Sequence, residues 1–88
     1  MNDLNNFRSR IDEIDDKIVR LLLERFAVVK NVAEYKKEHS LNVLQKDREA
    51  EVLRNIADKT DKTENREYKK YILEIYETVL KTSKSAQY

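Results

Sequence analysis

Residues 4–37 read LNNFRSRIDEIDDKIVRLLLERFAVVKNVAEYKK, and this stretch decides the fold. Its apolar positions recur in alternating steps of three and four, at Leu4, Phe7, Ile11, Ile14, Ile18, Leu21, Val28, Val32 and Tyr35. Only a helix places such positions on one stripe. The chain has no Pro and no Gly to interrupt the pattern. The sequence therefore predicts one continuous helix, roughly 50 Å long at a rise of ~1.5 Å per residue.

A helix of this length exceeds the ~30 Å diameter of a small domain. The residues that follow are too few to cover its stripe, so we expect a second copy of the chain to cover the rest. One position breaks the pattern, because Arg25 stands seventh on the stripe, where an apolar residue is expected. Lone charges on such stripes often fix helix register or extend to the rim. Arg25 alone is thus open to both a structural and a functional interpretation.

The composition limits the classes of function. The 88 residues predict a single domain, residues 1–88. The net charge of +1 disfavours a nucleic-acid binder that works by bulk charge. The absence of Cys and Gly, with one His, argues against thiolate or histidine metal clusters and Gly-rich phosphate loops. No apolar run approaches the ~18 residues that cross a bilayer, so we expect a cytoplasmic protein that does not contact membranes.

Two further helices should follow the first, giving an all-α subunit of three helices that are long, short and medium. The expected ranges are about 3–38, 45–58 and 64–85. Asn2 or Asp3 would cap the first helix, and turn-forming residues between His39 and Val43 would end it. A wholly polar segment, residues 59–65, separates the second helix from the third.

Polar side chains stand on or beside the apolar faces of all three predicted helices, at Arg25, Lys36, Arg48, Glu49, Ser83 and Gln87. Lys36 faces nearly the same way as Arg25, three helical turns further on. Ser83 and Gln87 continue the apolar stripe of the third helix. Together these residues describe a cationic pocket, with one acid and one amide, inside an aliphatic bundle. Burying unpaired cations costs several kcal/mol, so an anionic ligand is the natural complement.

Arg8 flanks the first stripe about 17 residues before Arg25, a separation of ~25 Å along one helix. Both arginines can contact one small ligand only if Arg8 comes from another subunit. A site that includes Arg8 would therefore be shared between two chains.

In this order and spacing, these residues resemble the all-helical, AroQ-class chorismate mutases. The shared pattern is Arg8-x-x-Ile11-Asp12-x-Ile14-Asp15, Leu22-x-x-Arg25, Val32-Ala33-x-x-Lys36, Asp47-Arg48-Glu49 and Ser83-x-x-x-Gln87. The resemblance covers essentially the whole chain. It implies an intertwined homodimer of three-helix subunits with two active sites. It also implies the Claisen rearrangement of chorismate to prephenate, on the way to Phe and Tyr, with no cofactor and no metal.

The resemblance further implies roles around the breaking bond, with Lys36, Gln87 and Arg25 as the catalytic residues. Arg25 and, from the partner subunit, Arg8 would hold the two carboxylates of the substrate. Lys36 would bridge a carboxylate and the ether oxygen. Gln87 would donate to that same oxygen from the other side.

The remaining implied contacts lie around the ring. Glu49 would accept a hydrogen bond from the ring hydroxyl, and Arg48 would help to fix that corner. Ser83 would line the carboxylate end. Gln45 stands where some relatives have an Asp, one turn before the Arg-Glu pair, and it is a further candidate contact to the hydroxyl.

Two alternative functions are compatible with parts of the pattern. An isochorismate pyruvate lyase shares this fold and much of the cationic set, but Glu49 matches the hydroxyl contact of the mutases. A non-catalytic helical dimerisation module would explain the heptads and treat inward charges as register devices. It would leave unexplained why Ser83 and Gln87 complete a core stripe.

Overall fold

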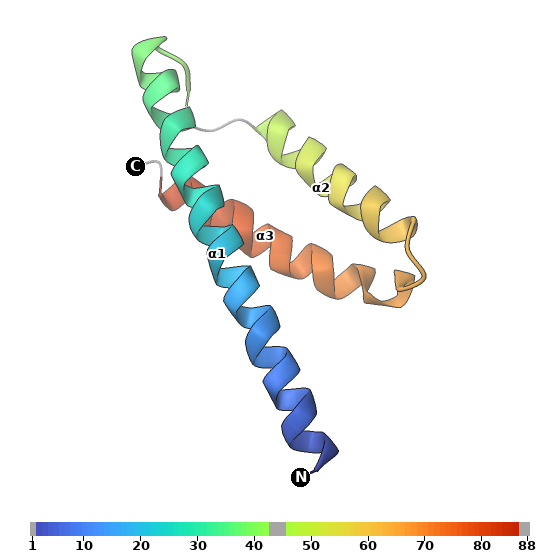
Figure 1. The fold of residues 1–88 in the computed structure, drawn as a ribbon. Coiled ribbons are helices and arrows are strands. Elements are labelled where there is room, and N and C mark those ends of the chain that lie inside the picture. Colours follow the sequence, from blue (N-terminus) through green and yellow to red (C-terminus); the bar gives the residue numbers. More distant parts are fainter. Residues whose placement is uncertain (1, 43–45, 87–88) are drawn as a thin grey trace.

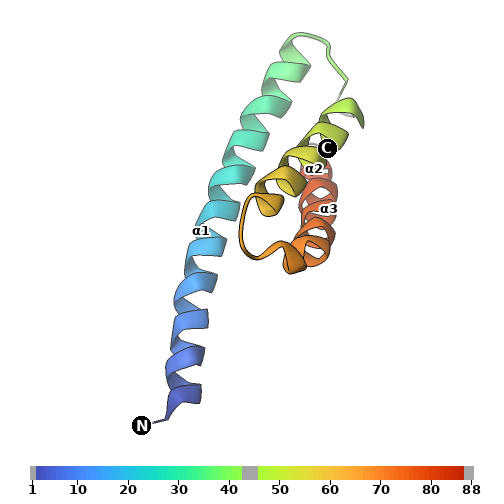
Figure 2. The ribbon, with the colours of Figure 1, turned by 90° about the vertical axis from the view of Figure 1, so that its right-hand side faces the viewer.

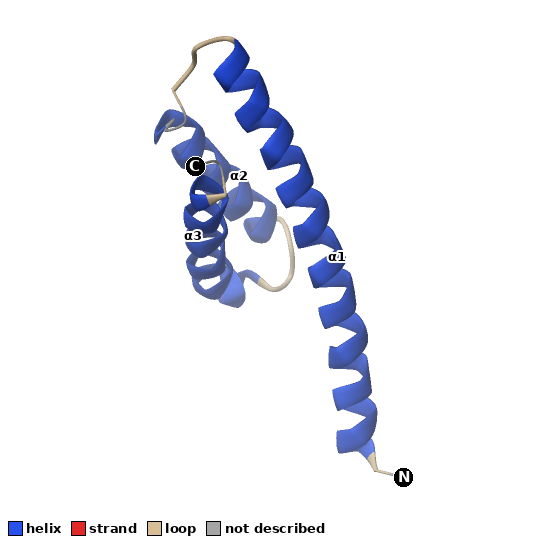
Figure 3. Ribbon diagram, turned by 90° about the vertical axis from the view of Figure 1, so that its left-hand side faces the viewer, coloured by secondary structure: helices blue, strands red, loops and turns tan. Residues whose placement is uncertain are grey.

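The structure is a computed structural model that describes residues 2–42 and 46–86. Over these residues the chain forms helix α1 (Asp3–Glu38), helix α2 (Lys46–Asp61), a single 3-10 turn η1 (Arg66–Tyr68) and helix α3 (Lys69–Ser85). Figures 1 and 3 show helices and connecting loops, with no strand in the described parts. The expected all-α fold, with a long, a short and a medium helix, is confirmed.

Helix α1 has the length that its uninterrupted stripe predicts. Asn2 caps its start, because the side-chain oxygen accepts a hydrogen bond of 2.8 Å from the backbone N–H of Asn5. His39 caps its end, and Ser40 follows with a φ of 54°. A left-handed residue directly after a helix is a common stop signal. The break therefore begins where the turn-forming residues predicted it.

The other two helices differ from their expected ranges at one end each. Helix α2 continues to Asp61 rather than ending near 58. Thr60 donates its hydroxyl to the carbonyl of Ile56, and Asp61 forms an ion pair of 3.0 Å with Lys69. Helix α3 begins at Lys69 rather than near 64, because η1 forms first, with the N–H of Tyr68 bonded to the carbonyl of Asn65. Residues 59–61 are polar, but they include no Gly or Pro, so the helix continues through them beyond the end of its apolar face.

Helices α2 and α3 form an antiparallel pair, and the C-terminal end of α3 crosses the C-terminal half of α1 (Figures 1 and 2). The N-terminal half of α1 extends past this pair, and no other element of the described residues lies beside it (Figures 1 and 2). The molecule measures 58 × 25 × 16 Å with a radius of gyration of 16.4 Å, whereas a compact chain of this length would have a radius of about 12 Å. The single chain is therefore elongated.

The apolar stripe of α1 is uncovered within the single chain. Its exposed members include Leu4, Phe7, Ile11, Ile14, Ile18, Leu21, Val28, Val32 and Tyr35. No apolar side chain among residues 2–42 and 46–86 is fully buried. In the same part of the chain, no helix has the length and apolar character needed to cross a membrane.

Candidate active site

A pocket of about 380 Å³ lies where the C-terminal half of α1 meets the beginning of α2 and the end of α3. Its aliphatic wall is formed by Val28, Val29, Val32, Val52 and Leu80. Its polar side chains come from all three helices, and they are Arg25, Lys36, Arg48, Glu49, Ser83 and Lys84. We call this the polar pocket. Its volume is within the range of small-molecule sites, about 300–1,000 Å³.

Arg25 and Ser83 connect α1 to α3 inside the polar pocket. An Nη1 hydrogen of Arg25 is donated to the Ser83 hydroxyl oxygen. That hydroxyl in turn donates to the backbone carbonyl of Val79, at 2.7 Å. Ser83 thus uses its acceptor and its donor at once. Because one hydroxyl is anchored on its own helix and contacts the guanidinium, it fixes the direction of Arg25 toward the pocket.

Lys36 and Ser83 are the two most protected residues that the structure describes, at 8% and 6% exposure. Each lies on a helix face where the flanking positions are apolar. Long cations usually keep their charged end in water. Lys36 therefore brings an unusually well-buried amino group to the wall of the cavity.

At the beginning of α2, Arg48 and Glu49 point their charges in different directions. Arg48 forms an ion pair with Glu51, and its side chain is 61% exposed. Glu49 is half-buried, and its Oε1 lies 2.9 Å from Lys84 Nζ. That oxygen is buried and accepts no well-aligned hydrogen bond from the described residues, so the contact with Lys84 is an ion pair defined by distance. Of these two adjacent residues, Glu49 therefore has the more buried side chain, at 28% exposure against 61% for Arg48.

The structure brings five of the candidate residues to one pocket and places one, Arg8, elsewhere. Arg8 is an exposed residue in the N-terminal half of α1, far along the helix from the polar pocket of its own chain. Gln45 and Gln87 fall outside the described residues. The separation of Arg8 from Arg25 along one helix is the one expected from the sequence.

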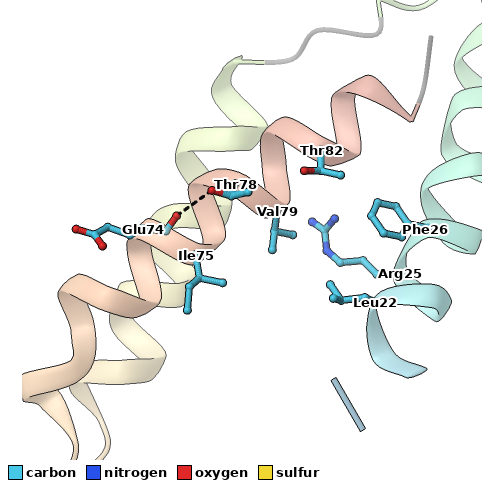
Figure 4. Close-up of a pocket in the computed structure, with 8 residues that line it drawn as sticks. All are labelled: Leu22, Arg25, Phe26, Glu74, Ile75, Thr78, Val79 and Thr82. Atoms are coloured by element: carbon cyan, nitrogen blue, oxygen red, sulfur yellow. Dashed lines mark hydrogen bonds between the residues drawn. The ribbon is translucent and has the colours of Figure 1, made fainter. Parts of the chain in front are cut away.

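A second, more open groove of about 480 Å³ separates α1 from α3. Figure 4 shows Leu22, Arg25 and Phe26 of α1 facing Ile75, Val79 and Thr82 of α3 across it. The groove is mainly apolar and shares Arg25 with the polar pocket. It offers few charged groups to an anion, which makes it the weaker candidate for a reaction site despite its larger volume.

Lys84 is a pocket residue that the sequence interpretation missed. It follows Ile72, Tyr76 and Leu80 in steps of four along α3, so it lies on the inward row. A lysine in the last turn of a helix is ordinarily explained by the helix dipole and by solvent. Only the position of Glu49 on another helix shows that this lysine faces the pocket.

Comparison with known proteins identifies the family to which this fold and pocket belong. Residues 7–88 match the family described as chorismate mutase type II. Since the match covers nearly the whole sequence, the chain belongs to that family. It is thus an enzyme domain of the chorismate mutase type, as the sequence pattern predicts.

One curated relative is a bifunctional chorismate mutase/prephenate dehydratase from Aquifex aeolicus (strain VF5). It is 38% identical to the chain over 56 residues, which are 64% of this chain and 16% of the relative. The chain therefore corresponds to about a sixth of that longer protein. The search of solved structures found no significant match.

Proposed function

We propose that the polar pocket binds chorismate and catalyses its rearrangement to prephenate. The observation that carries this proposal is the convergence of Arg25, Lys36, Glu49 and Ser83 from three helices on one cavity. An aliphatic cavity lined by cations favours a small anion with an apolar body. Chorismate, a dicarboxylate built on a ring, has that character.

The reaction requires positioning and electrostatics rather than a nucleophile. A pericyclic rearrangement proceeds once the substrate is held in its folded, reactive conformer, which is an orientation effect. In our proposal Arg25, directed by Ser83, holds one carboxylate. Arg8 of the partner subunit holds the other. These contacts are equally present before and during the reaction, so they mainly contribute binding.

Acceleration comes from donors directed at the ether oxygen, where negative charge develops as the C–O bond breaks. Lys36 and Gln87 take this role in our proposal. Preorganised donors stabilise the transition state more than the ground state. Glu49 accepts from the ring hydroxyl on the opposite side, with Arg48 and Gln45 near that corner. No step of this mechanism calls for a cofactor.

The site is complete only in a homodimer. The exposed stripe of α1 and the elongated shape of the single chain support this part of the proposal. A second copy would cover the apolar residues and bring its own Arg8 toward the polar pocket. The stripe repeats through the N-terminal half of α1, beside which no other element lies among residues 2–42 and 46–86. The cytoplasmic location expected from the sequence remains a prediction.

The test is turnover of chorismate, followed by its loss of absorbance and by identification of the product. We expect prephenate, and no pyruvate from isochorismate. Lys36→Met should lower kcat by ~10²-fold or more, since it removes a donor to the developing charge. Lys37→Met is the matched control, because Lys37 is the exposed neighbour. Release of pyruvate from isochorismate would favour the lyase, and inactivity on both substrates would favour a non-catalytic module.

A further inference from the structure

We propose that Lys84 is a positioning residue that holds the Glu49 carboxylate in place for the ring hydroxyl of the substrate. This inference rests on the proposed function and adds a residue to it. Lys84 Nζ lies 2.9 Å from Glu49 Oε1, and the two side chains, 34% and 28% exposed, both line the polar pocket. They come from α3 and α2, so the contact links two helices across the pocket wall.

Glu49 needs such a partner because one of its carboxylate oxygens is withdrawn from solvent. Its Oε1 is buried without a well-aligned hydrogen bond among the residues that the structure describes. A buried charge is costly unless it is paired. Arg48, the adjacent cation, contacts Glu51 instead. Lys84 is therefore the cation that compensates the charge of Glu49. It approaches from α3, whereas Glu49 and its sequence neighbour Arg48 are on α2.

The charges of the polar pocket point the same way. Arg25, Lys36 and Lys84 carry three positive charges and Glu49 carries one negative charge, which leaves a net +2, while Arg48 and Glu51 cancel. A dicarboxylate carries two negative charges, and Arg8 of the partner subunit would add one further positive charge to the proposed site. Without Lys84, Glu49 would reduce this balance to +1 and would repel an approaching carboxylate more strongly. Lys84 thus allows an acid to be present in a site for an anion.

The predicted effect falls on substrate binding. The ring hydroxyl is not at the breaking bond, so its hydrogen bond to Glu49 contributes similarly to the ground state and the transition state. Loss of such a contact raises KM and leaves kcat nearly unchanged. Lys84→Met keeps most of the aliphatic stem and removes the charge. We expect KM for chorismate to rise about tenfold, with kcat within about twofold of the parent.

Two variants test whether this effect depends on charge at this position. Lys84→Arg keeps a cation within reach and should restore most of the lost affinity. Lys81→Met removes the same charge from an exposed position on the same helix and should behave like the parent. Far-ultraviolet circular dichroism of each variant verifies that the helices are formed. If Lys84→Met and Lys81→Met had equal KM values, the inference would be wrong.

A double-mutant cycle separates action through Glu49 from direct contact with substrate. If Lys84 acts through Glu49, then Lys84→Met should add little in a Glu49→Gln background. Additive losses would overturn the inference and place Lys84 on the substrate itself. A substrate analogue without the ring hydroxyl, used as a competitive inhibitor, should lose less affinity than chorismate when Lys84 is replaced by Met, because it keeps the carboxylates but has no hydroxyl to contact Glu49.

These experiments distinguish a failure of the Lys84 inference from a failure of the proposed function. An active parent in which Glu49→Gln is impaired and Lys84→Met is not would overturn only the role of Lys84. A parent that leaves chorismate unchanged would overturn the proposed function and this inference together.

Discussion

Ser83 shows how a single hydroxyl can organise a charged site. It accepts from Arg25 and donates to the carbonyl of Val79, so the guanidinium is held by a group anchored on its own helix. Among the described residues, only Lys36 is comparably protected from solvent. In the proposed mechanism, that arrangement fixes Arg25 before the substrate arrives, which lowers the ordering needed on binding.

Ser83→Ala should therefore weaken substrate binding without unfolding the chain. A hydrogen bond to a charged group contributes about 1.5–3 kcal/mol, so we expect kcat/KM to fall by roughly tenfold or more. The control is Ser85→Ala, because Ser85 is an exposed residue on the same helix that also donates to a backbone carbonyl. Steady-state kinetics of both variants make the comparison. Equal activity of the two would contradict a role for Ser83 in directing Arg25.

Gln87 is the residue whose proposed role is most sensitive to a change of one atom. In the proposed mechanism Gln87 is a neutral donor to the ether oxygen. Gln87→Ala should therefore lose on the order of 3 kcal/mol of transition-state stabilisation, or ~10²-fold in kcat. Gln87→Glu should be poor at neutral pH, since an ionised carboxylate cannot donate and would repel the developing charge. It should regain activity as the pH falls and the carboxyl becomes protonated.

The measurement is kcat/KM for Gln87→Glu and for the parent between about pH 4.5 and 8, the range over which an acidic side chain completes its ionisation. The parent profile should be flatter. A variant that matched the parent throughout would assign the ether-oxygen contact to Lys36 alone.

Residues of the polar pocket can be predicted from the sequence at positions where a polar side chain interrupts an apolar stripe. Arg25, Lys36, Glu49 and Ser83 carry that signal, and they converge on one cavity. Lys84 was missed because a lysine near a helix end has an ordinary explanation in solvation. Its contact with Glu49 depends on how α2 packs against α3, and the spacing of residues along one helix carries no information about that packing. The catalytic roles themselves remain predictions.

Among the elements, α1 was the most predictable, because its pattern is long and contains no breaker. The far end of α2 was predicted too early, since its last residues are polar and are held by local contacts such as Thr60 to Ile56. The start of α3 was also misplaced, because a 3-10 turn precedes it. Both errors occur where apolar periodicity is absent and local hydrogen bonds decide the backbone.

The stripe of α1 leads to a prediction about association. Ile18→Lys places a charge on the stripe, where a second copy would bury it, and should shift the protein toward monomers with loss of activity. Asp16→Lys introduces the same side chain on the opposite face of the helix and should leave the dimer intact. Sedimentation at low protein concentration should give about twice the 10.6 kDa chain mass for the parent and Asp16→Lys. A parent that was active as a monomer would contradict the shared site.

At the scale of the whole molecule, a single chain does not enclose an apolar core. The described residues contain no fully buried apolar side chain, and the chain is longer than a compact one would be. Small chains that bury little surface generally need oligomerisation or another source of stability. Folding, association and completion of the active site would thus be one coupled event.

The central claim is that each active site combines Arg25 of one chain with Arg8 of the other. Arg8→Ala and Arg25→Ala should each be nearly inactive as homodimers. A heterodimer of the two variants would contain one intact site and one site that lacks both arginines. After mixing and re-equilibration, about half of the dimers are heterodimers, so activity should recover to about a quarter of the parent value. No recovery from verified heterodimers would show that both arginines serve the same chain, and it would contradict the account.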